Sequence, residues 1–485
     1  MRRTRPTARH LGRSGAALVV SGVVLLTDLL TATHAALGAG AVPPACGASD
    51  SSVADPGAPH GLFVLFPLPT GPDYAAIQQY VMGSSLACGA NFYLDWASAD
   101  TGPGHTPRYN FSAMDALTQP WAALNKIVNI DVWGVGYTAG VNRTTPQYVL
   151  GQINTVTCGT GPGSQTLPIY WEPAYEQNWE AFIRAVVDHY QNDSYIGYLR
   201  FGIGVGGEDL PASDIGSSTC ASKFAPYGYS GPFWVNYTRQ LIQFMGSLHS
   251  SKQLMVSMNL DPPKSSNSTT ADAVAATAVP MGIGIGSQGL QWSDANSTTT
   301  GAPCSGDWCR NFALFEGRVP MELQTLYYSC PVSPCSGWEE AQTGSLDVLL
   351  PFALQGHTQV FELYWQDWLS ALDPAYPTYT SSYLAAFCST AQVVGYLNPS
   401  VACPSPPVAP SPAPGTTGPV GWEGYLLVVG VVVAATFIVL WVRRGRRRVR
   451  AQGDPPGPGG WHRGSGGSEG PHTPAERPED RGAGP

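Results

Sequence analysis

Three glutamates lie inside apolar segments of this chain, where an ionisable side chain is costly unless it faces a polar cavity. Glu208 ends the stretch YLRFGIGVGGEDL, Glu322 lies in VPMELQT, and Glu362 lies in VFELYWQDW. Two carboxyl groups that flank one bond can serve as acid/base and nucleophile, which is how a glycosidic bond is cleaved. These segments therefore indicate acid/base chemistry by paired carboxylates.

The stretch 198–210 reads as a buried strand that delivers Glu208 into a glycine-lined pocket. Apolar residues alternate along it, and its four glycines remove side chains where a ligand or another backbone must approach closely. The same letters satisfy G-x-G-x-x-G. However, Glu-Asp-Leu-Pro follows where a helix N-terminus should receive phosphates, so we expect no dinucleotide and no other cofactor.

Eight apolar strands alternate with helical or loop segments, the pattern of a parallel sheet built from βα units. We expect strands at 61–68, 91–97, 126–135, 198–206, 253–260, 280–286, 319–325 and 358–365. Helices are expected at 73–87, 111–124, 176–190, 232–249, 270–278, 338–355 and 379–395, and the loops of the catalytic face at 136–170 and 287–318. The predicted fold is a (β/α)₈ barrel of the α/β class, with an open doubly wound sheet as the alternative.

The order of pieces from Pro168 to Leu210 resembles the glycoside hydrolases of clan A, the β-galactosidase-like and cellulase-like (β/α)₈ barrels. The resembling pieces are a helix that ends in tyrosine, a short Asn-Asp-Ser-Tyr-Ile turn and a strand that ends in glutamate. In that clan the acid/base glutamate ends strand four and the nucleophile ends strand seven. The resemblance thus implies a retaining glycosidase, with Glu208 as acid/base and Glu322 as nucleophile.

Two alternatives stay open beside this assignment. Glu362 is the competing nucleophile or a ligand of sugar hydroxyls, because it shares one face of the last strand with Tyr364 and Gln366. Gly207 stands where the clan usually has asparagine before the acid/base. A non-catalytic carbohydrate-binding or surface-layer protein on a degenerate hydrolase barrel is therefore the second interpretation.

Aromatic residues at predicted strand ends suit a saccharide cleft, because aromatic faces stack on the C–H faces of sugars. We expect substrate contacts from Trp96, Trp133, Trp171, Trp292, Tyr364, Trp365 and Trp368. For any single one of them, a place in the hydrophobic core is nearly as good an interpretation.

Other chemistries lack their motifs. The nine histidines show no zinc-site spacing, so no metal is expected, and no G-x-S-x-G elbow follows a strand. Residues 43–420 carry 11 Lys plus Arg against 27 Asp plus Glu, a net charge of −16, which argues against nucleic acid as a partner. No feature of the sequence sets an oligomeric state.

The N-terminal region and the cysteines indicate export. Residues 1–42 carry arginines before an apolar run, the pattern of a signal peptide, with an uncleaved anchor as the alternative. All ten cysteines fall within 43–403, where we expect five disulfides that include Cys304–Cys309, Cys330–Cys335 and Cys388–Cys403. Six N-x-S/T sequons in the same region predict a glycoprotein if the host glycosylates exported proteins.

A second apolar run, 425–442, has 18 residues without a charge and would span about 27 Å as a helix, enough for a bilayer core. Six arginines follow it, so we expect the tail 443–485 in the cytoplasm and the catalytic domain 43–403 outside. A proline-rich stalk, 404–424, joins the domain to this span. The predicted location is the cell membrane, with a single pass.

This topology predicts the outcome of protease treatment of intact cells. Protease should digest the domain 43–403 and leave a protected fragment that carries the arginine-rich tail, because only the tail lies behind the membrane. Immunoblots against tags at the two ends measure both parts. Full protection of the domain in intact cells, with digestion only after lysis, would contradict the export prediction.

Overall fold

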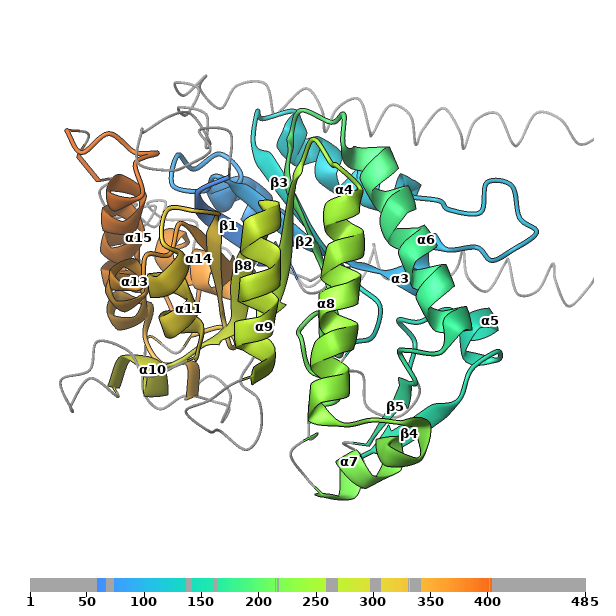
Figure 1. The fold of residues 1–485 in the computed structure, drawn as a ribbon. Coiled ribbons are helices and arrows are strands. Elements are labelled where there is room, and N and C mark those ends of the chain that lie inside the picture. The colour runs from blue at the N-terminus through green and yellow to red at the C-terminus, as the bar shows by residue number, and fades with distance from the viewer. Residues whose placement is uncertain are drawn as a thin grey trace, which may run out of the picture. The chain divides into compact units, whose positions relative to one another are not determined.

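The structure is a computed structural model that describes residues 59–66, 74–136, 142–159, 164–213, 215, 218–258, 269–296, 307–329, 331, 342–400 and 402–403. Eight parallel strands close into a barrel in the order β1-β10-β9-β8-β7-β6-β3-β2 (Figure 1). They are β1 (Gly61–Phe66), β2 (Gly89–Asp95), β3 (Ile127–Trp133), β6 (Ile196–Phe201), β7 (Gln253–Met258), β8 (Gly284–Leu290), β9 (Met321–Thr325) and β10 (Val360–Tyr364). The predicted barrel is confirmed, and the open sheet is wrong.

Helices connect the strands and cover the outside of the barrel. The longer ones are α4 (Ser112–Ala122), α6 (Pro173–Tyr190), α8 (Gly231–Ser247), α9 (Thr269–Ala278), α11 (Asp307–Phe315), α13 (Leu346–Gln355), α14 (Trp365–Leu372) and α15 (Ser381–Val393). Shorter ones are α2 (Tyr74–Ala76), α3 (Trp96–Ala99), α5 (Gln147–Leu150), α7 (Ser218–Phe224), α10 (Trp292–Asn296), the π-helix Ile77–Val81 and the 3₁₀ turns Ala225–Tyr227 and Val279–Met281.

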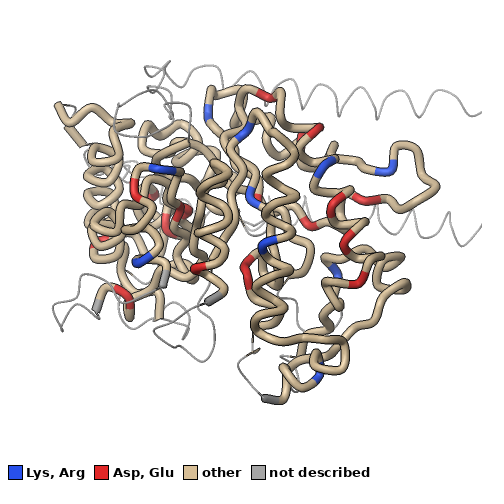
Figure 2. Tube along the Cα trace, in the orientation of Figure 1, with Lys and Arg blue, Asp and Glu red and all other residues tan. Residues whose placement is uncertain are grey.

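The strands are apolar because both of their faces are covered. Every residue of β1 and of β10 is buried, as expected for parallel strands with helices on one side and a filled barrel on the other. Helix α6 begins with a proline, which suits the first helical position, and turns Trp179, Phe182, Ile183 and Val186 into the core. Figure 2 shows how few positions along the chain carry a charge.

Two predicted loops contain regular structure. Segment 136–170 holds α5 and a two-stranded antiparallel sheet of β4 (Thr155–Cys158) and β5 (Gln165–Pro168). Segment 287–318 begins inside β8, which runs four residues later than predicted, and continues through α10 and α11. Only alternate residues of β4 are buried, so this strand lacks the apolar run from which the barrel strands were predicted.

Disulfides join parts of the chain that are distant in sequence. Cys388–Cys403 is confirmed, and Cys158–Cys220 ties the β4–β5 hairpin to α7. All six cysteines among the described residues, Cys88, Cys158, Cys220, Cys309, Cys388 and Cys403, are disulfide-bonded. Of the predicted pairs, Cys330–Cys335 lies outside the described residues, as does one half of Cys304–Cys309.

The predicted targeting and membrane segments all lie outside the described residues: 1–42, 404–424, 425–442 and 443–485. Within the described part of the chain, no helix has the length and apolar character that crossing a membrane requires.

Candidate active site

Polar side chains line the barrel interior at alternate positions of five strands. Because side chains two residues apart share one face of a strand, each pair points the same way. The pairs are Asn91 and Tyr93 in β2, Asn129 and Asp131 in β3, Tyr198 and Arg200 in β6, Glu322 and Gln324 in β9, and Glu362 and Tyr364 in β10. Side chains from β6 contact side chains from β9 and β10, which are not its neighbours in the sheet, so these groups meet across the interior.

Arg200 is the centre of this cluster. Its Nη1 lies 2.5 Å from Glu322 Oε2, and its Nη2 lies 3.0 Å from Glu362 Oε2. Nη2 also donates to Asp131 Oδ2 and, at 3.1 Å, to Gln324 Oε1. The arginine is 1% exposed and all three carboxyl groups are fully buried. One guanidinium therefore binds three carboxyl groups out of contact with water.

Asn91 is the second donor in the cluster. Its amide nitrogen bonds to Asp131 Oδ2 and to Tyr198 Oη, both at 3.1 Å, and to Glu362 Oε1. This amide joins two carboxyl groups that would otherwise repel each other.

One arginine cannot neutralise three ionised carboxylates, and the pKa values of the acids reflect this. Burial raises the pKa of Glu322 to about 7 and that of Asp131 to about 6, although Arg200 opposes both shifts. Burial and the neighbouring Asp131 hold the pKa of Glu362 well above its usual range. Burial therefore favours the protonated form of Glu362, while Arg200 stabilises the ionised forms of Asp131 and Glu322.

Glu208 lies in the glycine-rich segment that follows β6, because the strand ends at Phe201 and not at the predicted residue 206. This segment folds back on itself: Gly204 N donates to Glu208 O at 2.7 Å, and Val205 N donates to Leu210 O at 2.8 Å. A Cβ on Gly204 would lie 1.9 Å from Leu210 O. The predicted close approach of backbone is confirmed, and Glu208 is held at 4% exposure.

A hydrogen-bonded path connects Arg200 to the glycine-rich segment. With its amide nitrogen facing Gly206, Gln288 of β8 donates to Gly206 O at 2.9 Å and accepts from Arg200 Nη2 at 3.0 Å. Gly206 N in turn donates to Val135 O at 2.7 Å. The segment that carries Glu208 is therefore anchored to the same guanidinium that binds Glu322.

Two aromatic rings lie at the carboxyl ends of β2 and β3. Trp133 packs against Tyr93 with 4.3 Å between ring centroids and the two rings tilted, and Tyr93 Oη donates to Gln324 Oε1 at 3.1 Å. A Cβ on Gly207 would come within 2.6 Å of Trp133 Nε1, so the indole lies directly against the residue before Glu208. Trp133 is partly exposed. It is thus an aromatic surface beside both predicted catalytic segments.

Tyr364 also belongs to this region, since its phenol influences the pKa of Tyr93. Its ring lies 5.5 Å from the ring of Tyr327, just after β9. Trp365 begins α14 and is partly buried.

The other predicted aromatic contacts lie elsewhere. Trp96 and Trp368 are fully buried core residues, packed against Trp179 and Phe387 respectively. Trp171 lies in a group of rings near α7 and α8, and its Nε1 donates to Tyr227 O at 2.7 Å. Trp292 begins α10 and is 42% exposed. The structure does not bring these four to the charged cluster.

Several residues of the cluster were not expected from the sequence. Asn91, Tyr93, Gln288 and Gln324 were not singled out, although each is a polar residue in a strand with buried neighbours. For Asn91, Tyr93 and Gln324, the signal that could have found them is polar residues two apart in predicted strands, whereas Gln288 falls in the predicted loop 287–318. Within the described residues, no group of three His, Cys, Asp or Glu side chains is arranged to hold a metal ion.

Comparisons with known proteins find structures of similar architecture and no similar sequence. No protein-family model and no curated protein matches the chain. An endo-β-1,4-xylanase of family 10 from Gloeophyllum trabeum matches at 14% identity and a TM-score of 0.39, over 66% of this chain and 86% of the xylanase. An exo-β-1,4-mannosidase from Opitutaceae bacterium strain TAV5 matches at 12% identity and 0.39, over 71% of this chain and 63% of the mannosidase.

A third solved structure, the catalytic domain of a β-amylase from Paenibacillus polymyxa, matches at 12% identity and a TM-score of 0.34, over 69% of this chain and 90% of that domain. The expected resemblance to barrel glycoside hydrolases is thus found among solved structures. At these scores it carries no argument about the site, and the barrel itself rests on the strand pairing described above.

The buried acids predict how stability depends on pH. Glu322 has a folded-state pKa of about 7, above the value of about 4.3 for an unfolded chain, so the folded protein retains a proton that the unfolded chain has released. The free energy of unfolding should therefore fall as pH rises from about 4.5 to 7, by a few kcal/mol, since one pKa unit corresponds to about 1.4 kcal/mol. Urea titrations across this range measure the fall.

Glu322→Gln should make this fall shallower, because the amide cannot release a proton and only the other buried acids, Asp131, Glu362 and Asp367, then contribute. Asp347→Asn, which changes an exposed carboxylate at the start of α13, is the matched control and should keep the wild-type slope. The burial of Asp367, whose pKa is also raised to about 7, contributes equally in all three proteins. Identical pH profiles for Glu322→Gln and the wild type would contradict the described environment of Glu322.

Proposed function

We propose that this chain is a retaining glycoside hydrolase, with Glu322 as nucleophile and Glu208 as acid/base. The observation that carries the proposal is the environment of the Glu322 carboxylate. Its Oε2 is bound by Arg200 at 2.5 Å, whereas its Oε1 has no hydrogen-bond partner among the described residues. One oxygen is thus anchored and the other is left to react.

Arg200 also favours Glu322 over Glu362 as the nucleophile. A carboxyl group must be ionised to attack, and the guanidinium opposes the rise that burial causes in the pKa of Glu322. Burial and Asp131 both raise the pKa of Glu362, which disfavours its ionised form. In this proposal Glu362 fixes the position of Asn91 and Arg200 and does not react.

The reaction would then follow the two-step course of retaining enzymes. Glu322 attacks the anomeric carbon while Glu208 gives a proton to the leaving oxygen. Glu208 then takes a proton from water, which attacks the glycosyl-enzyme and restores Glu322. Trp133 and Tyr93 would offer a stacking surface for a sugar ring, and the substrate would be an O-linked saccharide.

We also propose that the enzyme is exported and held to the membrane by residues 425–442. This rests on the apolar run and the arginines that follow it. Its substrate would then lie outside the cell.

A non-catalytic saccharide-binding protein is the second candidate. The full burial of Glu322, at 0% exposure, favours it, because buried ion pairs also occur as purely structural elements. Both the hydrolase and the binding protein would bind sugars, so a measurement of turnover is needed to distinguish them.

Replacing Glu322 tests the proposal on a panel of aryl glycosides. Glu322→Ala should lower kcat at least about a thousandfold, because the covalent route is lost. Added azide should restore turnover by entering the space left by the carboxylate, and the product should be a glycosyl azide of inverted configuration. Circular dichroism and the melting temperature of each variant establish that it is folded.

Glu208→Ala and Glu362→Gln complete this experiment. The first should slow substrates with poor leaving groups far more than activated aryl glycosides, because only the former need a proton in the first step. The second should retain most of the activity. Azide rescue of Glu362→Ala instead of Glu322→Ala would transfer the role of nucleophile, and sugar binding without turnover by the wild type would favour the binding protein.

A further inference from the structure

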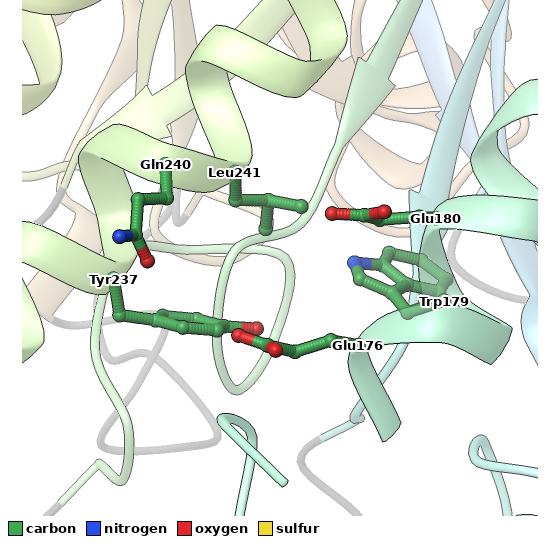
Figure 3. A pocket seen from close by; sticks show the side chains of 6 residues that line it. All are labelled: Glu176, Trp179, Glu180, Tyr237, Gln240 and Leu241. Atoms are coloured by element: carbon green, nitrogen blue, oxygen red, sulfur yellow. The ribbon is translucent and has the colours of Figure 1, made fainter. Parts of the chain in front are cut away.

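A cavity of about 240 Å³ lies between α6 and α8, on the outside of the barrel and apart from the Arg200 cluster. Each helix contributes three residues at positions i, i+3 and i+4, which share one helix face. They are Glu176, Trp179 and Glu180 from α6 and Tyr237, Gln240 and Leu241 from α8 (Figure 3). The proposed hydrolysis uses none of them.

Two buried polar groups face this cavity. Trp179 is 1% exposed and Tyr237 is 4% exposed, and neither the indole Nε1–H nor the phenol oxygen has a hydrogen-bond partner among the described residues. Figure 3 shows both atoms on the sides of their rings that face the space between the helices. Leaving such groups unpaired costs free energy, so each indicates a missing polar contact.

The charge of the cavity is negative. Glu176 and Glu180 both line it, and burial raises the pKa of each carboxyl group, with Glu180 adding to the shift at Glu176. Figure 2 shows the acidic positions along α6. The nearest cation on this helix, Arg184, is one turn beyond Glu180. Its charge lowers the pKa of Glu180, and its guanidinium lies over the ring of Phe244, 5.4 Å from the centroid. No lining residue is basic.

The donor set fits an organic cation better than a metal ion. Two carboxylates attract a positive charge, while the aromatic ring of Tyr237 and the side chain of Leu241 offer contacts to carbon atoms. The Nε1–H of Trp179 can only donate, so it requires an acceptor on the ligand. A ligand that satisfies all of these groups carries both a positive charge and an oxygen acceptor.

We propose that the α6–α8 cavity binds a small primary amine that carries a hydroxyl group. The ammonium donates hydrogen bonds to Glu176 and Glu180, and the hydroxyl oxygen accepts from Trp179 Nε1–H. The phenol oxygen of Tyr237 completes the contacts of the ammonium. Amino alcohols and amino sugars belong to this chemical class. The site is independent of the proposed hydrolysis, which is measured separately.

Thermal unfolding of the full chain with three matched probes tests this proposal. Ethanolamine has both groups, ethylene glycol lacks the charge, and ethylamine lacks the hydroxyl. Ethanolamine should raise the melting temperature in a saturable manner, because a ligand that binds only the folded state stabilises it. At equal concentration and ionic strength, ethylene glycol should give no shift and ethylamine a smaller one. Equal shifts from all three probes would overturn the proposal.

The variants localise the effect. Glu176→Gln with Glu180→Gln should weaken the apparent affinity for ethanolamine at least about tenfold, because two charge-assisted hydrogen bonds are lost. Asp188→Asn, an exposed carboxylate further along α6, is the matched control and should bind as the wild type does. Unchanged affinity in the double variant would overturn the proposal.

Tyr237→Phe keeps the test decisive if the double variant unfolds. It removes only the phenol oxygen and should weaken ethanolamine binding severalfold, so a wild-type affinity in Tyr237→Phe would also overturn the proposal. Stabilisation by an N-acetyl-lysine amide without stabilisation by ethanolamine would replace the small amine with a lysine side chain of a protein partner. Aryl glycoside hydrolysis by the same variants is read in parallel, so loss of one function is distinguishable from loss of the other.

Discussion

The interaction on which the site depends is the contact between Arg200 and the buried carboxyl groups of three other strands. Burying an ion costs several kcal/mol unless it is paired and hydrogen-bonded, and Arg200 meets that condition through Asp131, Glu322 and Glu362. Barrel interiors are usually filled by branched apolar side chains. In this barrel a layer of polar and charged side chains replaces them. The charge balance of that layer depends on one cation, Arg200. Removing that cation would leave the acids with no counter-charge and force them to bind protons.

The same arginine connects the barrel wall to the segment that carries Glu208. Through Gln288 it reaches Gly206. Gly204 allows the backbone to lie against Leu210, and Gly207 allows it to lie against Trp133. Gly286 serves the cluster in a different way, since a Cβ at this position would lie 2.0 Å from Glu322 Oε2. Glycine in β8 thus leaves room for the carboxylate of β9. The positions of both proposed catalytic glutamates therefore follow from one hydrogen-bonded assembly.

Most of the barrel strands could be predicted from the sequence. The parts of the fold that could not be predicted depend on contacts between residues far apart in the chain. Apolar runs located seven of the eight barrel strands, because parallel strands are buried on both faces, although β6 ends earlier than predicted. The eighth, β8, is rich in glycine, serine and glutamine, and its apolar signal is weak. The hairpin of β4 and β5 was missed because its stability comes from mutual pairing and from Cys158–Cys220. The local sequence pattern reveals neither the pairing of β4 with β5 nor the disulfide.

The side-chain contacts across the barrel interior could not be predicted from the sequence either. Arg200 is close to Glu208 in the chain, but its carboxylate partners come from β3, β9 and β10. Which side chains meet across a barrel depends on the register of all eight strands. The sequence places the polar residues of the interior at alternate positions along the strands. Their partners became evident only from the closed sheet.

The most direct test of this account is to identify the carboxylate that forms a covalent bond to a sugar. A panel of epoxide-bearing sugar mimics, each of which traps the nucleophile of a retaining glycosidase, would be incubated with the full chain, and labelled peptides would be located by mass spectrometry. We expect an ester on Glu322, because Arg200 binds one of its oxygens and the other has no hydrogen-bond partner among the described residues. An ester on Glu362 with Glu322 unmodified would contradict it.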